Sequence, residues 1–155
     1  MLKQSCKTVI WSAAKASATA LIPLSIIRVS ALTKITSEMA DEVVSSYGYK
    51  SLSGISTFFS IVLGAATGVR IANEVLERIP GIGTCAACVS TASLHLFTGA
   101  VLVGVCEMIK AGRLTDAELQ NTGFCKILCG RLVKNATQIV GNLIRGRNPI
   151  EFAYQ

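Results

Sequence analysis

Residues 79–106 read IPGIGTCAACVSTASLHLFTGAVLVGVC, a run of twenty-eight positions without a formally charged side chain. The run opens with Pro80, Gly81 and Gly83, which predict a sharp turn because proline and glycine both interrupt helices. Beyond this turn, the apolar pattern favours one helix over residues 84–111, and Gly112 ends it. The run also reaches the length of a membrane span, about 20 residues, although its serines, its threonines and His95 dilute its apolar character.

A second uncharged run, residues 51–69, comes before the turn. It predicts a helix over residues 52–78, which together with 84–111 makes a central antiparallel helical hairpin. Small residues recur at every fourth position along one side of this helix, and they form a predicted helix-packing seam: Ser56, Ser60, Gly64, Gly68 and Ala72. Such a seam lets another helix approach closely, either in a soluble bundle or in a bilayer. The sequence leaves these two surroundings open.

Two more helices are predicted before the hairpin. Residues 3–21 carry apolar side chains at helical spacing, and Pro23 ends that segment. Residues 24–47 are amphipathic, and Gly48 supplies a C-terminal stop. Both segments are expected to pack against the hairpin.

The chain after the hairpin predicts a basic helical extension over residues 113–155. Thr115 and Glu118 have the spacing of a capping box, in which each side chain accepts a hydrogen bond from a free backbone amide. Residues 124–144 predict one amphipathic helix, and the basic surface of this helix and its flank comprises Lys126, Arg131, Lys134, Arg145 and Arg147. Such a helix either lies on an anionic membrane or packs on its own bundle. The whole pattern predicts an all-α fold, a five- or six-helix bundle in a single domain over residues 1–155.

Composition and charge narrow the class of protein. Hydrophobic residues make up 51% of the chain and charged residues only 15%, below the roughly 25% of typical soluble domains. The net charge of +6 comes from the two ends, because residues 51–112 carry three basic and three acidic groups. A nucleic-acid binder needs a basic stripe and stacking aromatic side chains, and only 6% of this chain is aromatic. We therefore expect no nucleic-acid partner.

Residues suited to catalysis or metal binding are few. Cys85 and Cys88 have the spacing of a redox dithiol, but no strand precedes them. Cys125 and Cys129 add two more thiols at a spacing that is unusual for a zinc site. His95 is the only histidine, so the sequence offers no pair of nucleophile and base, and we expect this side chain to be packed in the core. We expect a non-enzymatic protein with no catalytic residue, no metal site and no cofactor.

The first residues of the chain are open to two interpretations. No acidic residue comes before Glu38, and serine and alanine are frequent there, which is typical of an organelle transit peptide. Arginine is almost absent from this segment, however, and the helical rhythm continues into the next one. We therefore favour a retained helix over a cleaved targeting segment.

Several segments follow one another in an order that resembles a known family. They are Ala20-Leu21-Ile22-Pro23-Leu24, the helix ending at Tyr47-Gly48, the helix with Gly64 and Gly68, and Leu76-Glu77-Arg78-Ile79-Pro80-Gly81-Ile82-Gly83 with a helix of small residues after it. Over residues 8–112 this order resembles the GTPase-associated helical domain family of unknown function, which occurs in bacteria attached to or encoded beside Era- and dynamin-like GTPases. The resemblance implies an all-helical, membrane-associated accessory domain without established catalytic residues. The chain departs from the family at Ile27-Arg28, where a second proline is replaced, and it has no GTPase module.

These observations predict a non-enzymatic, membrane-associated accessory or scaffold protein, with a GTPase as the partner that the resemblance implies. Basic residues on both outer sides of the hairpin place the two termini on the cytoplasmic side if the hairpin inserts. We also expect a protein partner or a second copy of the chain. The alternative is a soluble, cytoplasmic structural subunit whose apolar surfaces are buried in a larger assembly.

Overall fold

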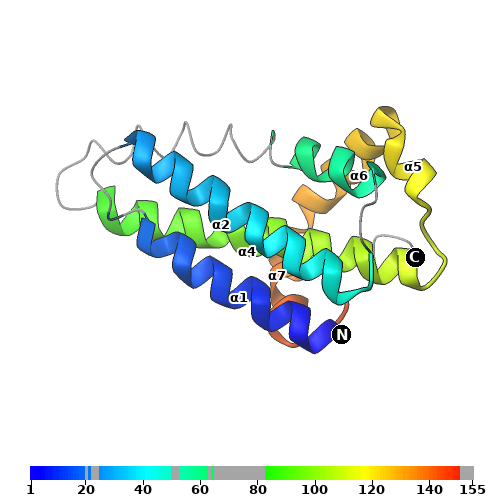
Figure 1. The fold of residues 1–155 in the computed structure, drawn as a ribbon, viewed down its shortest axis with the longest axis horizontal. Coiled ribbons are helices and arrows are strands. Elements are labelled where there is room, and N and C mark those ends of the chain that lie inside the picture. The colour runs from blue at the N-terminus through cyan, green and yellow to red at the C-terminus, as the bar shows by residue number, and fades with distance from the viewer. Residues whose placement is uncertain (20, 22–24, 50–52, 63, 65–82, 151–155) are drawn as a thin grey trace.

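The computed structural model describes residues 1–19, 21, 25–49, 53–62, 64 and 83–150. All regular structure in these ranges is α-helical, with no β-strand, so the predicted all-α class is confirmed. The helices are α1 (Leu2–Thr19), α2 (Ser25–Ser46), α4 (Gly83–Lys110), α5 (Asp116–Gln120), α6 (Thr122–Lys134) and α7 (Ala136–Ile144), and a further helix covers Ser53–Val62 (Figure 1).

Helix α4 lies at the centre of the described fold, and α1, α2 and α7 pack along it (Figure 1). Every residue from Thr98 to Cys106 is buried, so this part of α4 contacts its neighbours around its whole circumference. A helix surrounded by protein needs no polar face, which explains why this stretch shows no amphipathic pattern. The uncharged run that has the length of a membrane span is, over these residues, the core of the bundle.

Helices α1 and α2 run antiparallel beside one another, as the colours in Figure 1 show. Two side-chain hydrogen bonds join the beginning of α1 to the end of α2. The hydroxyl oxygens of Ser5 and Ser46 lie 2.8 Å apart, and the hydroxyl of Thr8 donates to Oε1 of Glu42 at 2.9 Å. Small residues on the buried side of α1 let the helices approach closely, and they account for much of that side: Ser5, Cys6, Thr8, Ser12, Ala13, Ala16 and Thr19.

The helix Ser53–Val62 begins at a carboxylate that is distant in the sequence. The backbone amide of Gly54 donates to Oδ1 of Asp116 at 2.8 Å, and the hydroxyl of Ser53 donates to Oδ2 at 3.3 Å. The first amides of a helix have no partner within the helix, and an anion there also interacts favourably with the helix dipole. Asp116 therefore caps this helix and joins it to α5. A side chain on Gly54 would collide with Asp116, so glycine is required for this contact.

The predicted helix ends are confirmed at three places. Gly48 and Gly112 adopt the left-handed backbone conformation, with φ of 81° and 68°, and each lies two residues beyond the last residue of its helix, α2 or α4. Glycine adopts this conformation without steric cost, which is why it commonly ends helices. Thr115 and Glu118 form the predicted capping box at the start of α5.

The single helix predicted over residues 124–144 is wrong. Helix α6 ends at Lys134 and α7 begins at Ala136, and Asn135 between them has a non-helical backbone with φ of −110° and ψ of 21°. Its side-chain amide donates to the carbonyl oxygen of Arg131 at 2.9 Å. Asparagine competes in this way for backbone groups, and it therefore favours a break between helices. The predicted apolar face of this segment has five members, of which Ala136 is half-buried and the other four are buried: Leu128, Leu132, Ile139 and Leu143.

Candidate functional site

A buried polar cluster lies where the end of α2 meets α4. Tyr47, only 7% exposed, donates its hydroxyl hydrogen to Oε1 of Glu107 at 2.7 Å. Tyr49 stacks against Tyr47 with ring centroids 6.4 Å apart and an angle of 10° between the ring planes. Burial, the hydrogen bond to Glu107 and the charge of this carboxylate raise the pKa of Tyr47 far above its ordinary value. The hydroxyl therefore stays protonated and links the two helices instead of acting as a base.

The buried thiols of the core are also held in their protonated form. Burial, and after it the charge of Glu107, raises the pKa of Cys6, and the same causes raise the pKa of Cys106 to about 12. Burial likewise raises the pKa of Cys125 and Cys129. A thiol must ionise before it acts as a nucleophile or metal ligand. These four cysteines therefore behave as small core residues.

The metal and redox alternatives gain no support from the described residues. In that part of the chain, no three His, Cys, Asp or Glu side chains are grouped so that they could hold a metal ion. Cys88 is a half-buried free thiol in the first turns of α4, and the side chain of Cys85 lies outside the described residues. His95 is 2% exposed, which confirms its predicted place in the core.

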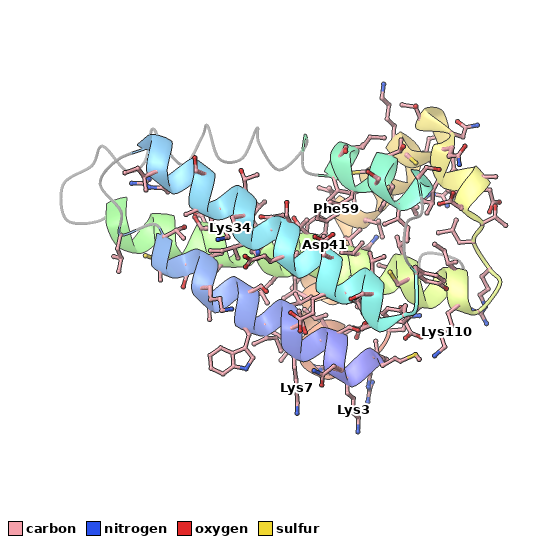
Figure 2. All side chains as sticks on the ribbon, in the orientation of Figure 1. Lys3, Lys7, Lys34, Asp41, Phe59 and Lys110 are labelled. Carbon is pink, nitrogen blue, oxygen red and sulfur yellow. The ribbon has the colours of Figure 1, made fainter. Side chains whose placement is uncertain are left out.

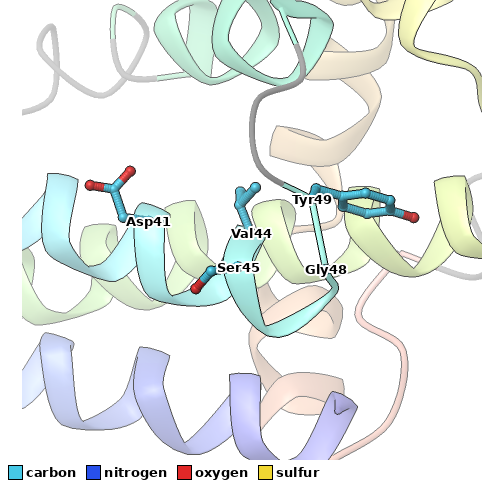
Figure 3. A pocket seen from close by; sticks show the side chains of 5 residues that line it. All are labelled: Asp41, Val44, Ser45, Gly48 and Tyr49. Atoms are coloured by element: carbon cyan, nitrogen blue, oxygen red, sulfur yellow. The ribbon is translucent and has the colours of Figure 1, made fainter.

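A groove of about 510 Å³ runs along the outer side of α2 (Figure 3). The residues that line it are Asp41, Val44, Ser45, Gly48 and Tyr49. Asp41 lies at one end of the groove and Tyr49 at the other (Figure 3). The hydroxyl of Ser45 donates to the carbonyl oxygen of Glu42 at 3.1 Å, so it is engaged with its own helix. These lining residues offer one carboxylate and an apolar floor, and they include no nucleophile paired with a base.

The three described residues of the predicted seam, Ser56, Ser60 and Gly64, are exposed. A Cβ atom added to Gly64 would meet nothing within 4 Å. The opposite side of the same helix faces the core through Ile55 and Phe58. Gly68, Ala72, Pro80 and Gly81 lie outside the described residues, and Gly83 is the first residue of α4. Within the described part of the chain, no helix packs on the seam.

Close approaches between segments occur instead at glycines of α4. A Cβ atom on Gly99 would lie 2.8 Å from Cγ2 of Val9 and 2.9 Å from Sδ of Met39. A Cβ atom on Gly104 would lie 2.9 Å from Cγ2 of Ile150. These two glycines are five residues apart, so they do not follow the four-residue spacing that pointed to the seam.

The predicted basic residues of the C-terminal extension are all exposed: Lys126, Arg131, Lys134, Arg145 and Arg147. They do not form one helical face, because the first three belong to α6 and the last two follow α7. On α6, the three basic side chains share one side with Ile127, which is 64% exposed.

A second basic surface, which sequence reasoning missed, covers the outer side of α1. Lys3, Lys7, Trp11 and Lys15 follow one another at intervals of four residues, and all are exposed. Figure 2 shows Lys3 and Lys7 projecting from α1 away from the other helices. The four-residue spacing and the lack of acidic residues were visible signals. The sequence alone does not show that the other side of α1 faces α2 and α4.

Comparison with known proteins identifies no neighbour of this chain, because no family model, curated protein or solved structure matches it. The resemblance to GTPase-associated helical domains therefore depends on the residues quoted for it.

We expect thiol labelling of the folded protein to separate the cysteines by burial. With an aromatic disulfide reagent near pH 8, Cys88 should react first among the described cysteines, whereas Cys106 should react only after unfolding. With its pKa near 12, Cys106 would be ionised in about one molecule in ten thousand at that pH. Mass spectrometry of the labelled peptides identifies each site. Rapid labelling of native Cys106 would contradict its burial.

The same pKa values predict a loss of stability at high pH. The folded protein keeps protons on Cys6 and Cys106 that the unfolded chain releases above about pH 9, because both pKa values are raised in the fold. The free energy of unfolding should therefore fall as the pH rises above about 9, and Cys106 alone should contribute up to about 1.4 kcal/mol per pH unit between pH 9 and 12. Urea unfolding of the native chain and of Cys106→Ala over this range checks the sign, since the variant should show the shallower dependence.

Proposed function

We propose that this protein is a non-enzymatic accessory or scaffold protein that works at a membrane surface. The observation that carries the proposal is the pairing of basic side chains with large exposed apolar ones on α1 and α6. Trp11 is 70% exposed among the lysines of α1, and Ile127 is 64% exposed beside Lys126 on α6. Helices of this kind lie in the interface of anionic membranes, with cations at the headgroups and the apolar side chain below them.

The bundle attaches to the membrane as a folded unit in this proposal. Among the described residues, one segment, Cys88–Lys110 of α4, is long and apolar enough to cross a membrane, and 61% of its most apolar window is buried inside the fold. Inserting it would separate it from α1, α2 and α7, which cover its apolar surface. The loss of these contacts favours peripheral attachment over an inserted hairpin. Both termini then stay on the cytoplasmic side.

For the arrangement of the helices, we propose the predicted central hairpin, in which a helix over residues 52–78 runs antiparallel to a helix over residues 84–111. Its small-residue seam then faces outward, as the exposure of Ser56, Ser60 and Gly64 supports. A helix of a second copy, or of a protein partner, packs there. The family resemblance makes a GTPase the partner to try first.

A soluble structural subunit remains the second candidate. It is favoured by large apolar side chains exposed on helices other than α1 and α6, such as Val89 at 66% and Ile144 at 61%. Such side chains would be covered in a larger assembly. Single exposed hydrophobic residues are common on monomeric proteins, however, so this observation weighs less than the basic surfaces.

Cell fractionation of the full chain tests the proposal. We expect the protein in the membrane fraction at low salt and its release by about 0.5 M salt, because salt screens attraction to anionic headgroups. Retention after alkaline carbonate would instead indicate an inserted hairpin. A soluble large complex would support the structural subunit. A soluble monomer at low salt would contradict membrane association altogether.

A further inference from the structure

The outer side of α1 is a continuous face without an acidic side chain. Its exposed residues are Lys3, Gln4, Lys7, Ile10, Trp11, Ala14, Lys15 and Ala18. With 3.6 residues per turn these positions share one side of the helix, and the buried residues occupy the other side. No aspartate or glutamate occurs before Glu38 in the sequence, so α1 contributes only positive charge.

Basic residues outside α1 lie beside this face and add to its positive charge. A Cβ atom on Gly146 would lie 3.9 Å from Cγ of Lys3, which places the turn after α7 beside the start of α1. Arg145 and Arg147 flank Gly146, and both are exposed. The α2 carboxylate that contacts α1, Glu42, accepts a hydrogen bond from buried Thr8 and so lies at the side of α1 that faces α2.

We propose that this face of α1 binds the surface of a bilayer that contains anionic phospholipids. Lys3, Lys7 and Lys15 contact the phosphate-bearing headgroups, and Trp11 enters the interface between headgroups and acyl chains. The inference rests on the proposed function, because it names the surface and the lipid class for the same membrane attachment.

The mixture of side chains favours a lipid surface over another acidic partner. An indole sits well at the level of the headgroups because it is apolar with one polar N–H group. Ile10, which is 40% exposed, lies next to Trp11 and adds apolar area to the same face. The hydrocarbon part of a lysine side chain is also apolar. It can therefore reach up to place the ammonium group among the headgroups while the helix axis lies deeper in the interface. With α1 flat on the membrane, the opposite side of α1 remains packed on α2 and α4.

Trp11 is the only tryptophan of the chain, so its fluorescence reports on this face alone. We expect the emission of the full chain to shift to shorter wavelength with vesicles of phosphatidylcholine and phosphatidylserine, and not with pure phosphatidylcholine. Lipids brominated in the upper acyl chain should quench this emission. Co-sedimentation with the anionic vesicles without any change in Trp11 emission would overturn the inference, because another surface would then carry the binding.

A pair of matched variants tests the lysines. Each lysine near an anionic surface contributes about fivefold in affinity, so Lys3→Ala, Lys7→Ala and Lys15→Ala together should weaken vesicle binding about a hundredfold at low salt. The comparison variant removes the same charge from α6 through Lys126→Ala, Arg131→Ala and Lys134→Ala, and we expect it to weaken binding less than the α1 variant does, because it leaves Trp11 and its neighbouring lysines in place. Both sets are exposed, and circular dichroism with thermal unfolding checks that both variants fold.

The outcomes separate this inference from the proposed function. Loss of binding in the α6 variant, with binding intact in the α1 variant, would overturn the α1 surface and leave membrane attachment standing. If the native chain binds no vesicle but stays with cell membranes, a protein partner holds it there, and only the lipid inference fails. If it binds neither vesicles nor cell membranes, both proposals fail.

Discussion

Replacing Phe58 by alanine should lower the free energy of unfolding by about 3–5 kcal/mol. The side chain is 1% exposed and belongs to the apolar core, together with Ile55 and Val62 from the same helix. Alanine would leave a cavity that the surrounding helices fill only in part, and the cost includes both lost burial and lost packing. Urea unfolding followed by circular dichroism measures the change. For a domain with 5–15 kcal/mol of total stability, this is a large fraction.

The result bears on the function as well as on the fold. If Ser53–Val62 packs on the bundle in water, Phe58→Ala is costly and Ile127→Ala, at a position 64% exposed, is nearly neutral, within about 0.5 kcal/mol. If the helix lay in lipid, its apolar side chains would contribute little to the stability of the soluble protein. If Phe58→Ala and the native chain had equal free energies of unfolding, this result would contradict a packed domain and support insertion of the hairpin in the membrane.

Local chemistry made much of the fold predictable. Gly48 and Gly112 end helices because they adopt positive φ, and the Thr115–Glu118 capping box depends on residues three positions apart. Such signals depend on neighbours along the chain, so a single sequence contains them. The break at Asn135 was missed because the apolar spacing continues across it, while the local competition of one side chain for backbone groups decides the outcome.

Contacts between distant segments were not predictable in the same way. The helix Ser53–Val62 has a side of small residues and a side with Phe58, and the pattern alone does not tell which side meets the core. In the structure, Asp116 caps its first turn and Phe58 turns inward. The outer face of α1 is a similar case, because Lys3 and Trp11 become a surface only once the opposite side of α1 is known to be buried. The use of the seam by a partner stays a prediction.

Replacing Gly99 by leucine should destabilise the protein by about 3 kcal/mol. Overpacking a filled core typically costs about 1–3 kcal/mol, and this substitution belongs at the upper end because leucine adds three carbons beyond the Cβ atom. The backbone of α4 passes at Gly99 within contact distance of Val9 from α1 and Met39 from α2. All three residues lie in the core, where neighbouring side chains leave little room for relaxation. Gly130→Leu is the matched control, since a Cβ atom there meets nothing within 4 Å. In an exposed helical position leucine should stabilise by up to about 1 kcal/mol relative to glycine.

A double-mutant cycle identifies the contact that causes this effect. Gly99→Ala should be destabilising because its Cβ atom collides with the methyl groups of Val9, and Val9→Ala should be destabilising because it removes buried methyl groups. The two changes together should cost less than their sum, by roughly 1 kcal/mol or more, because Val9→Ala removes the atoms that the new Cβ atom meets. Strict additivity would mean that α1 and α4 do not meet at Gly99. The outer face of α1 would then lose the fixed orientation on which its binding to a membrane depends.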